Sequence, residues 1–217
     1  MESDDAAERA RQRALVRRAY DAISVAYRSD DGDAAASSAE DVSRYAGWVA
    51  ELAGLLRPGA RVVDLGCGAG IPATRELASY GLQVLGADFS AVQLRRARCL
   101  VPAARFVQAD MAALHFRPAS AAAVVAFYSL IHVPLADQRA LFPRIRGWLQ
   151  PGGYFLAIVG AGQWTGTASY LGADMFWDHA DAAMYLRWLQ EAQLTPIWNR
   201  YVPEGTSGHT LVLAQAS

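Results

Sequence analysis

An apolar run leads directly into three alternating glycines in the segment Val62-Val63-Asp64-Leu65-Gly66-Cys67-Gly68-Ala69-Gly70. The branched residues predict a buried strand, and Pro72 suits the first turn of a helix, where a missing N–H costs little. Glycine suits the turn between them because the turn needs unusual backbone angles and a ligand approaches most closely where no Cβ stands. The segment therefore predicts a strand, turn and helix that bind a nucleotide, and a tight turn without a ligand is the alternative.

Short apolar strands alternate with helices beyond this turn. Strands are expected at residues 61–65, 83–88, 105–109, 121–128, 154–159, 195–201 and 209–214. Helices are expected at residues 72–80, 91–100, 136–149 and 180–192. This alternation predicts an α/β fold with a parallel sheet covered by helices on both faces. Only residues 203–208 join the last two strands, so these two must pair as an antiparallel hairpin.

Two helices precede the glycine-rich turn. Apolar residues at three- and four-residue spacing predict one helix over roughly the first 30 residues and another over about residues 41–56. Pro58 and Gly59 end the second helix. Residues 34–40 are small and polar, which predicts a mobile connection between the two helices.

The composition fits one globular domain. The chain has 217 residues, of which 53% are hydrophobic and 19% charged, enough for a sizeable core. Lys+Arg is 20 against 21 Asp+Glu, and this balance argues against a nucleic-acid partner, which needs an excess of cations. No apolar run approaches the ~18 residues of a membrane span, so no membrane association is expected.

All 20 basic residues are arginines, and this absence of lysine excludes Schiff-base lysine chemistry, a P-loop and a Tyr/Lys dehydrogenase pair. The two cysteines, Cys67 and Cys99, suggest no disulfide framework. Together with an acidic N-terminus unlike a secretory signal, they predict a cytoplasmic protein. The bias towards alanine and arginine is typical of a GC-rich, bacterial coding sequence.

Two carboxylates follow predicted strands. Asp88 ends the second strand, where a carboxylate reaches the two hydroxyls of a bound ribose. Asp110 ends the third, where it can accept a hydrogen bond from an adenine amino group. The alternative for each is a helix N-cap. Ser90 is the better cap beside Asp88, whereas both interpretations of Asp110 remain open.

These features together resemble class I S-adenosylmethionine-dependent methyltransferases. The resemblance rests on the glycine-rich loop, Asp88, the Ala109-Asp110-Met111 segment and residues 127–134, Phe-Tyr-Ser-Leu-Ile-His-Val-Pro. It implies a Rossmann-like, seven-stranded sheet in the order 3-2-1-4-5-7-6 with the last strand antiparallel. It also implies an N-terminal helical lid at residues 1–56 and a domain that binds S-adenosylmethionine at residues 57–217.

Within that class the chain is similar to small-molecule methyltransferases of ubiquinone or menaquinone biosynthesis and of natural products. It lacks the Asn/Asp-Pro-Pro-Tyr/Phe motif of the N-methylating relatives that act on adenine, cytosine and glutamine. It shows no clear set of magnesium-binding carboxylates, so no metal is expected. The cofactor-binding residues that the resemblance implies are Tyr20, Tyr27, Asp64, Gly66, Gly68, Gly70, Asp88, Phe89, Asp110, Met111 and Tyr128. For the two tyrosines of the first helix, core packing is an equal alternative.

The chemistry of a sulfonium methyl donor requires alignment of the acceptor and exclusion of water, and a base where the acceptor atom carries a proton. His132, after the fourth strand, is the first candidate for a base or an acceptor-orienting group. A histidine bonded to nearby backbone is the alternative. His179 lies in an aromatic segment, Asp174 to His179, which lines the acceptor pocket in the family. Here Asp178 as a helix cap, with Trp177 in the core, is the alternative.

Three functions therefore stay open. The first is methyl transfer from S-adenosylmethionine to an O, N or C atom of a small molecule. The second is an NAD(P)-dependent oxidoreductase, which the G-x-G-x-G spacing of the glycines and the missing lysine oppose. The third is a protein of the same fold that binds the cofactor but transfers nothing, because a fold does not fix a function. The oligomeric state cannot be read from the sequence.

Overall fold

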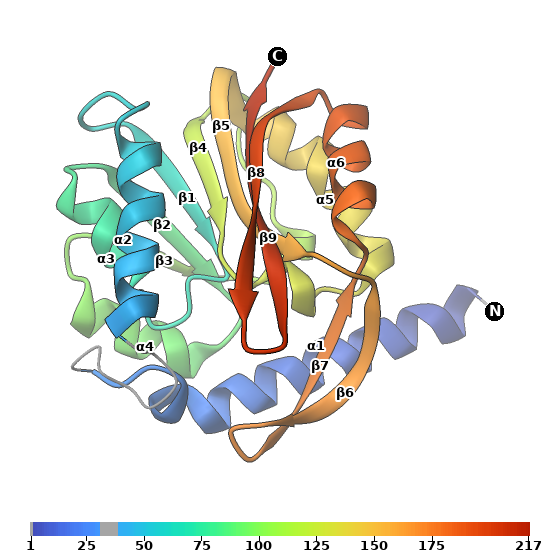
Figure 1. The fold of residues 1–217 in the computed structure, drawn as a ribbon. Helices are drawn as coiled ribbons and strands as arrows, with labels where there is room; N and C mark the ends of the chain where they lie inside the picture. Colours follow the sequence, from blue (N-terminus) through green and yellow to red (C-terminus); the bar gives the residue numbers. More distant parts are fainter. Residues whose placement is uncertain (1, 31–38) are drawn as a thin grey trace.

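The computed structural model describes residues 2–30 and 39–217, and a central sheet of seven strands organises them (Figure 1). The strands are β1 (Arg61–Leu65), β2 (Gln83–Asp88), β3 (Arg105–Gln108), β4 (Ala121–Ala126), β5 (Leu149–Gly160), β8 (Leu194–Glu204) and β9 (Ser207–Ala216). Their spatial order is β3-β2-β1-β4-β5-β9-β8, with β9 antiparallel to both of its neighbours. When only these seven strands are counted, this is the predicted order 3-2-1-4-5-7-6, and the predicted Rossmann-like α/β fold is confirmed.

Helices cover both faces of the sheet (Figure 1). They are α2 (Ala39–Ala53), α3 (Ala73–Ser79), α4 (Ala91–Leu100), α5 (Leu135–Trp148) and α6 (Ala182–Glu191). Successive strand residues point to opposite faces, so Val62 packs in a cluster with α2 and α3 while Val63 packs in a cluster with α5 and α6. Burial on both faces explains why the strands of the parallel part read as continuous apolar runs.

The first helix, α1 (Glu2–Tyr27), runs beneath the carboxyl ends of the parallel strands (Figure 1). Beside it lies a separate antiparallel hairpin of β6 (Trp164–Tyr170) and β7 (Ala173–His179). Val16 and Ile23 of α1 pack against Met175 and Phe176 of β7 in a small cluster of their own. This cluster fixes α1 across the end of the sheet.

The sequence analysis missed this hairpin because β6 contains glycine, serine and threonine and is largely exposed, so it carries little apolar alternation. Residues 61–65, 83–88 and 91–100 form the elements predicted for them. β8 and β9 run further than predicted because their ladder continues to the pair Glu204 and Ser207. The predicted mobile connection falls mainly in residues 31–38, outside the described residues. Among the helices described, none is both long and apolar enough to cross a bilayer.

Candidate functional site

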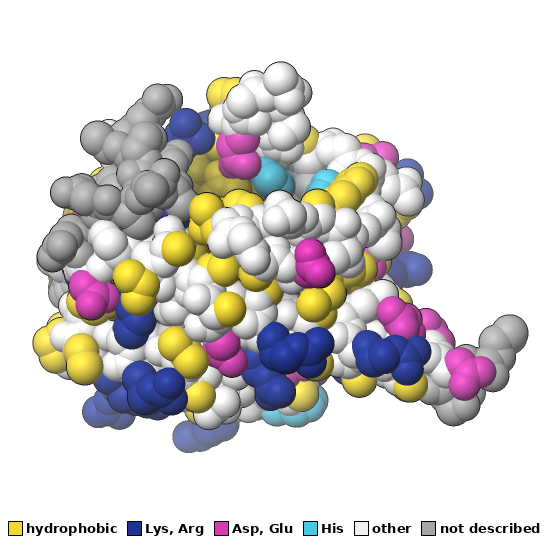
Figure 2. Space-filling model, turned by 90° about the horizontal axis from the view of Figure 1, so that it is seen from below, with side chains coloured by type: hydrophobic (Ala, Val, Ile, Leu, Met, Phe, Trp, Pro, Cys, Tyr) yellow, Lys and Arg dark blue, Asp and Glu magenta, His cyan; other side chains and the backbone are white. Residues whose placement is uncertain are grey.

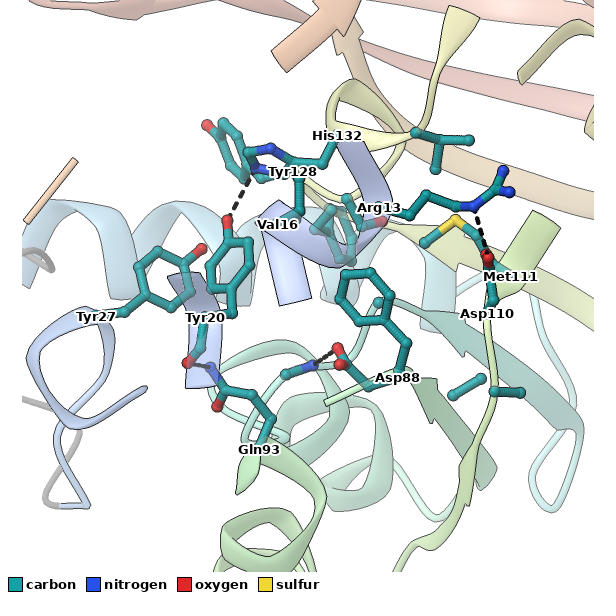
Figure 3. Close-up of a pocket in the computed structure, with 18 residues that line it drawn as sticks. Arg13, Val16, Tyr20, Tyr27, Asp88, Gln93, Asp110, Met111, Tyr128 and His132 are labelled. Carbon is teal, nitrogen blue, oxygen red and sulfur yellow. Dashed lines mark hydrogen bonds and ion pairs between the residues drawn. The ribbon is translucent and has the colours of Figure 1, made fainter. Parts of the chain in front are cut away.

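A cavity lies at the carboxyl ends of β1, β2 and β4, and side chains of α1 form part of its wall (Figure 3). We call it the first cavity. Its lining includes Arg13, Val16, Tyr20, Tyr27, Gly66, Gly68, Asp88, Phe89, Gln93, Asp110, Met111, Tyr128, Ser129 and His132. Nine of the eleven residues predicted to bind a cofactor are therefore brought to one place. Asp64 and Gly70 are not among the described lining residues.

The glycine-rich turn forms one wall of the first cavity. Gly66 has a φ of +73°, and a Cβ there would stand 2.3 Å from the Cβ of Ser129. Gly68 has a φ of +54° and faces open space. Gly70 was predicted to pack on the ligand, but a Cβ there would instead meet Val101 at 3.0 Å. Gly70 thus allows close packing of the turn against the chain that follows α4, and its contact with a ligand stays a prediction.

Two buried carboxylates support this turn differently. Asp88 is 9% exposed, and its two oxygens accept hydrogen bonds from the backbone N–H groups of Gly68 (2.9 Å) and Ser90 (2.8 Å). Burial raises the pKa of Asp88 to about 6, although these two hydrogen bonds oppose the rise. Asp64, only 2% exposed, accepts a hydrogen bond from the Thr74 hydroxyl at 2.6 Å. Burial raises its pKa to about 7. Asp64 therefore braces the strand and helix from behind the cavity wall.

Asp110 has two partners. One oxygen accepts a hydrogen bond from the N–H of Ala112 at 2.9 Å, which caps the short helix η1 (Met111–Ala113). The other lies 3.2 Å from Nε of Arg13 on α1 (Figure 3). Asp110 is therefore a helix cap that also lines the first cavity, and Ser90 caps α4 as expected. Arg13, which also pairs with Asp137, had no sequence signal that distinguished it from the other arginines of the first helix.

His132 lies in the short helix η2 (Leu130–His132) and is 8% exposed. Its Nδ1 is 2.7 Å from the carbonyl oxygen of Phe176, and its Nε2 is 2.9 Å from the Tyr20 hydroxyl (Figure 3). Because a carbonyl only accepts, Nδ1 carries the proton and Nε2 accepts the hydrogen bond from Tyr20. Burial lowers the pKa of His132 to about 4. Both ring nitrogens of His132 therefore have hydrogen-bond partners, and the neutral ring holds the Tyr20 hydroxyl in place. Its lowered pKa makes His132 a weak proton acceptor.

A second cavity adjoins the first. Tyr20, Tyr27, Tyr128 and His132 line both. The other walls of the second cavity come from the residue after α1, from α2, from η2, from the hairpin β6–β7 and from the facing ends of β8 and β9. These walls are Arg28, Arg44, Tyr45, Trp48, Ile131, Tyr170, Trp177, Glu204 and His209. Figure 2 looks at this end of the molecule, where histidine and acidic side chains lie beside a depression lined with hydrophobic ones.

The β8–β9 turn places a carboxylate and a histidine in the second cavity. Oε2 of Glu204 lies 3.0 Å from Nδ1 of His209, and Oε1 accepts a hydrogen bond from the Tyr128 hydroxyl. Burial alone would raise the pKa of Glu204, but the hydrogen bonds from His209 and Tyr128 bring it below its usual value. The sequence analysis treated His209 only as the start of the last strand, because the contact with Glu204 depends on the hairpin register.

His179, a predicted catalytic residue, is not among the described residues that line either cavity. Its Nδ1 is 2.7 Å from the carbonyl oxygen of Gly162, and its ring faces His209 at 6.0 Å between centroids. Asp181, rather than Asp178, caps α6. Asp178 instead accepts hydrogen bonds from the N–H of Leu135 and from Thr165. The cap lies three residues later than expected because β7 extends through His179, so α6 begins only at Ala182.

Comparison with known proteins finds similarity over part of the chain. Residues 62–153 match the family described as a methyltransferase domain. The chain is 31% identical over 140 residues to sterol 24-C-methyltransferase ERG6B of Gibberella zeae, which covers 62% of this chain and 35% of that protein. The chain thus spans about a third of the length of that curated relative.

Two solved structures share the fold across nearly the whole chain. Magnesium protoporphyrin IX methyltransferase (ChlM) from Synechocystis PCC 6803, solved with bound S-adenosylmethionine, has a TM-score of 0.73 at 17% identity and covers 95% of this chain and 97% of its own. The [4+2]-cyclase SpnF has a TM-score of 0.74 at 21% identity, covering 93% and 94%. At these identities the likeness shows the fold alone. One of these proteins is a methyltransferase and the other a [4+2]-cyclase, so this fold serves more than one reaction.

Proposed function

We propose that the protein transfers the methyl group of S-adenosylmethionine to an O, N or C atom of a small molecule, as part of secondary-metabolite or cofactor biosynthesis. The match of residues 62–153 to the methyltransferase-domain family supports this proposal. The observation that carries this proposal is the juxtaposition of Asp88 with Gly66 and Gly68 in the first cavity. When bound, S-adenosylmethionine supplies a methyl group on a sulfonium, which an acceptor atom attacks directly.

The residues of the first cavity fit this cofactor. Each oxygen of Asp88 is bonded to one backbone N–H, so lone pairs remain for the two ribose hydroxyls. Gly68 leaves open space at the turn, where a side chain would otherwise stand. We assign the adenine to the surroundings of Phe89, Asp110 and Met111, which line the same cavity. Asp64 contributes indirectly, since it holds the strand and helix that carry the turn.

In this proposal, three tyrosines surround the sulfonium of the bound donor. Tyr20 and Tyr27 pack edge to face, with 5.3 Å between their centroids, and Tyr128 lines the same cavity. Aromatic faces attract a sulfonium by cation–π interaction, and a cavity closed by α1 excludes water. We therefore propose that α1 is the part of the segment 1–56 that serves as the lid, while α2 belongs to the body of the domain.

We assign His132 a positioning role rather than that of a base. Its Nε2 holds the Tyr20 hydroxyl, and burial keeps the ring neutral. The variant His132→Gln retains an acceptor for Tyr20 and tests this role. We expect methyl transfer to slow while the dissociation constant of S-adenosylhomocysteine stays near that of the wild type. A loss of binding equal to the loss of turnover would contradict the assignment.

The free cysteines are relevant to the cellular compartment in which the protein works. Cys67 is buried and Cys99 exposed, and neither forms a disulfide. This pattern supports our proposal that the protein works in the reducing bacterial cytoplasm. Mass spectrometry of the protein isolated from its native cells, with free thiols alkylated first, checks whether both cysteines are reduced there.

Calorimetric titration with S-adenosylhomocysteine, and in parallel with NADH and NADPH, tests which cofactor the protein binds. Binding of S-adenosylhomocysteine alone supports the proposal, and binding of a nicotinamide instead would overturn it in favour of an oxidoreductase. Incubation with S-adenosylmethionine and a panel of phenols, amines and carboxylates then tests turnover. Tight binding with no S-adenosylhomocysteine formed from any of them would favour a protein that binds the cofactor without methyl transfer.

A further inference from the structure

The lining of the second cavity is rich in aromatic side chains, which suits a flat ring. Tyr45 and Trp48 wall it from α2, and Tyr170 and Trp177 wall it from the hairpin β6–β7. Tyr170 and Trp177 meet edge to face at 5.8 Å, and Tyr45 and Trp48 lie 5.2 Å apart. Aromatic walls on two sides favour an aromatic or conjugated guest, which offers stacking and edge contacts to both.

The charges of the lining add a second requirement. Arg28 and Arg44 contribute two positive charges, and Glu204 contributes one negative charge. The guanidinium of Arg28 is itself buried, 4.4 Å from the Tyr27 ring centroid. Among the described residues of the lining, the two arginines outnumber the one carboxylate. Such a lining favours a guest that is anionic or that becomes anionic on binding.

The contact of His209 with Glu204 provides a proton acceptor in this cavity. Because the Glu204 carboxylate only accepts, Nδ1 of His209 carries the proton and Nε2 is left with its lone pair. A carboxylate that holds one ring nitrogen fixes the tautomer and stabilises the charged ring that forms when the other nitrogen takes a proton. His132, the other histidine of the lining, already accepts from Tyr20 at Nε2.

We propose that the second cavity binds the methyl acceptor, that this acceptor is an aromatic or conjugated ring with an ionisable hydroxyl, and that His209 is the base that removes its proton. The O–H bond breaks and its proton passes to Nε2 of His209. A lone pair of the oxygen forms the new C–O bond, and the C–S bond of the donor breaks with its electron pair left on sulfur. Glu204 is the positioning residue of His209.

This inference rests on the proposed methyl transfer and makes one of its three acceptor atoms, oxygen, the expected one. The two cavities share Tyr20, Tyr27, Tyr128 and His132, so an acceptor in the second cavity borders a donor in the first. Binding of a phenol can be measured without any donor. A failure of the phenol to bind is therefore distinguishable from a failure of S-adenosylhomocysteine to bind in the cofactor titration.

The first experiment uses 4-nitrophenol, whose anion absorbs visible light, together with quenching of tryptophan fluorescence as an independent measure of binding. At a fixed pH below the pKa of free 4-nitrophenol, the wild type should bind it and develop phenolate absorbance. The variant His209→Gln should still bind but lose this absorbance. His179→Gln, which changes a neighbouring histidine outside both linings, is the matched control and should behave as the wild type. Equal phenolate absorbance in wild type and His209→Gln would overturn the proposal.

Competition and turnover complete the test. 4-Hydroxybenzoate should displace 4-nitrophenol at lower concentration than tyramine does, because arginines outnumber carboxylates among the described lining residues; the reverse order would contradict the assigned acceptor class. With a phenol that is methylated, His209→Gln should lower kcat by about 100- to 10,000-fold, the usual share of a general base. Glu204→Gln should lower kcat less and leave the KM for the phenol nearly unchanged. Unchanged turnover in His209→Gln would remove His209 as the base.

Discussion

The two cavities are built from different parts of the chain. Outside α1, the described lining of the first cavity lies within the segment that matches the methyltransferase domain, and the glycine-rich turn forms one of its walls. The second cavity takes most of its lining from α2, the β6–β7 hairpin and the β8–β9 turn, all outside residues 62–153. When one cavity is built by the shared part of a fold and the other by variable segments around it, the same fold can serve many substrates.

α1 connects the two cavities, because Tyr20 and Tyr27 line both. It is held by side chains rather than by the sheet. Ser24 donates a hydrogen bond to Gln93 on α4 at 2.9 Å, and the apolar side of α1 packs on β7. We therefore expect α1 and the β6–β7 hairpin to loosen together while the rest of the domain stays folded.

Met175→Ala should break this connection and gives the largest expected effect. Met175 of β7 is fully buried in the cluster that joins this strand to α1, and such a truncation costs about 2–5 kcal/mol. Because the residue belongs to the small cluster, we expect faster hydrogen exchange in α1 and weaker binding of S-adenosylhomocysteine, with little change in the main unfolding transition. Hydrogen exchange followed by mass spectrometry measures this.

The matched control is Ile145→Ala, a truncation in the main core beneath α5, where Ile145 is fully buried. It should lower the main unfolding temperature and leave the relative protection of α1 unchanged. If the two variants lowered the same transition by the same amount, α1 would be part of one cooperative unit with the sheet, and the two cavities could not open separately.

The sequence predicted the first cavity well and the second poorly, for a physical reason. The glycines and Asp88 follow strands whose apolar runs are unmistakable, so their positions at one edge of the sheet follow from the topology. His209 and Glu204 come together only through the register of a hairpin, which the residue pattern leaves open over several positions. Gly70 and His179 are not among the described lining residues of either cavity, and their position in a motif does not reveal which way they face.

Asp64→Asn tests whether Asp64 has a structural role, in contrast to Asp88, which we propose to bind the cofactor. Burial raises the pKa of Asp64 from an ordinary 3.8 to about 7 in the folded protein. Between these pH values the unfolded chain releases a proton that the folded chain keeps, so stability falls as pH rises and levels off above pH 7. The variant cannot release that proton, so we expect it to gain stability over the wild type as pH rises from 4 to 8.

Each unit of pKa corresponds to about 1.4 kcal/mol, which puts the gain at pH 8 at up to about 4 kcal/mol. Urea unfolding at pH 4, 6 and 8 checks it. Some loss of stability with rising pH should remain in the variant, since burial also raises the pKa of Asp88 to about 6. An advantage of the wild type at pH 8 would mean that Asp64 is needed as a charged group.

Asp88→Ala tests binding in the first cavity itself. Losing a hydrogen-bonded carboxylate that contacts a ligand costs about 1.5–3 kcal/mol, so the dissociation constant of S-adenosylhomocysteine should rise about 10- to 150-fold. Asp181→Ala, which removes the cap of α6 away from both cavities, is the matched control and should leave the constant unchanged. An unaltered constant in Asp88→Ala, with the fold intact, would remove Asp88 from the cofactor site.

Arg13→Ala gives the smallest effect and tests whether charge pairs also hold α1 over the first cavity. Arg13 pairs with Asp110 and Asp137, and its side chain is 28% exposed, so the pairs are worth about 0.2–1 kcal/mol. We expect S-adenosylhomocysteine to bind about 1.5- to 5-fold more weakly, with the difference shrinking as salt screens the pairs in the wild type. Arg11→Ala removes an exposed pair with Glu8 within α1 and should leave binding unchanged. If both variants weakened binding equally, the loss would come from the helix as a whole, and the pairs of Arg13 would have no specific part in holding α1 in place.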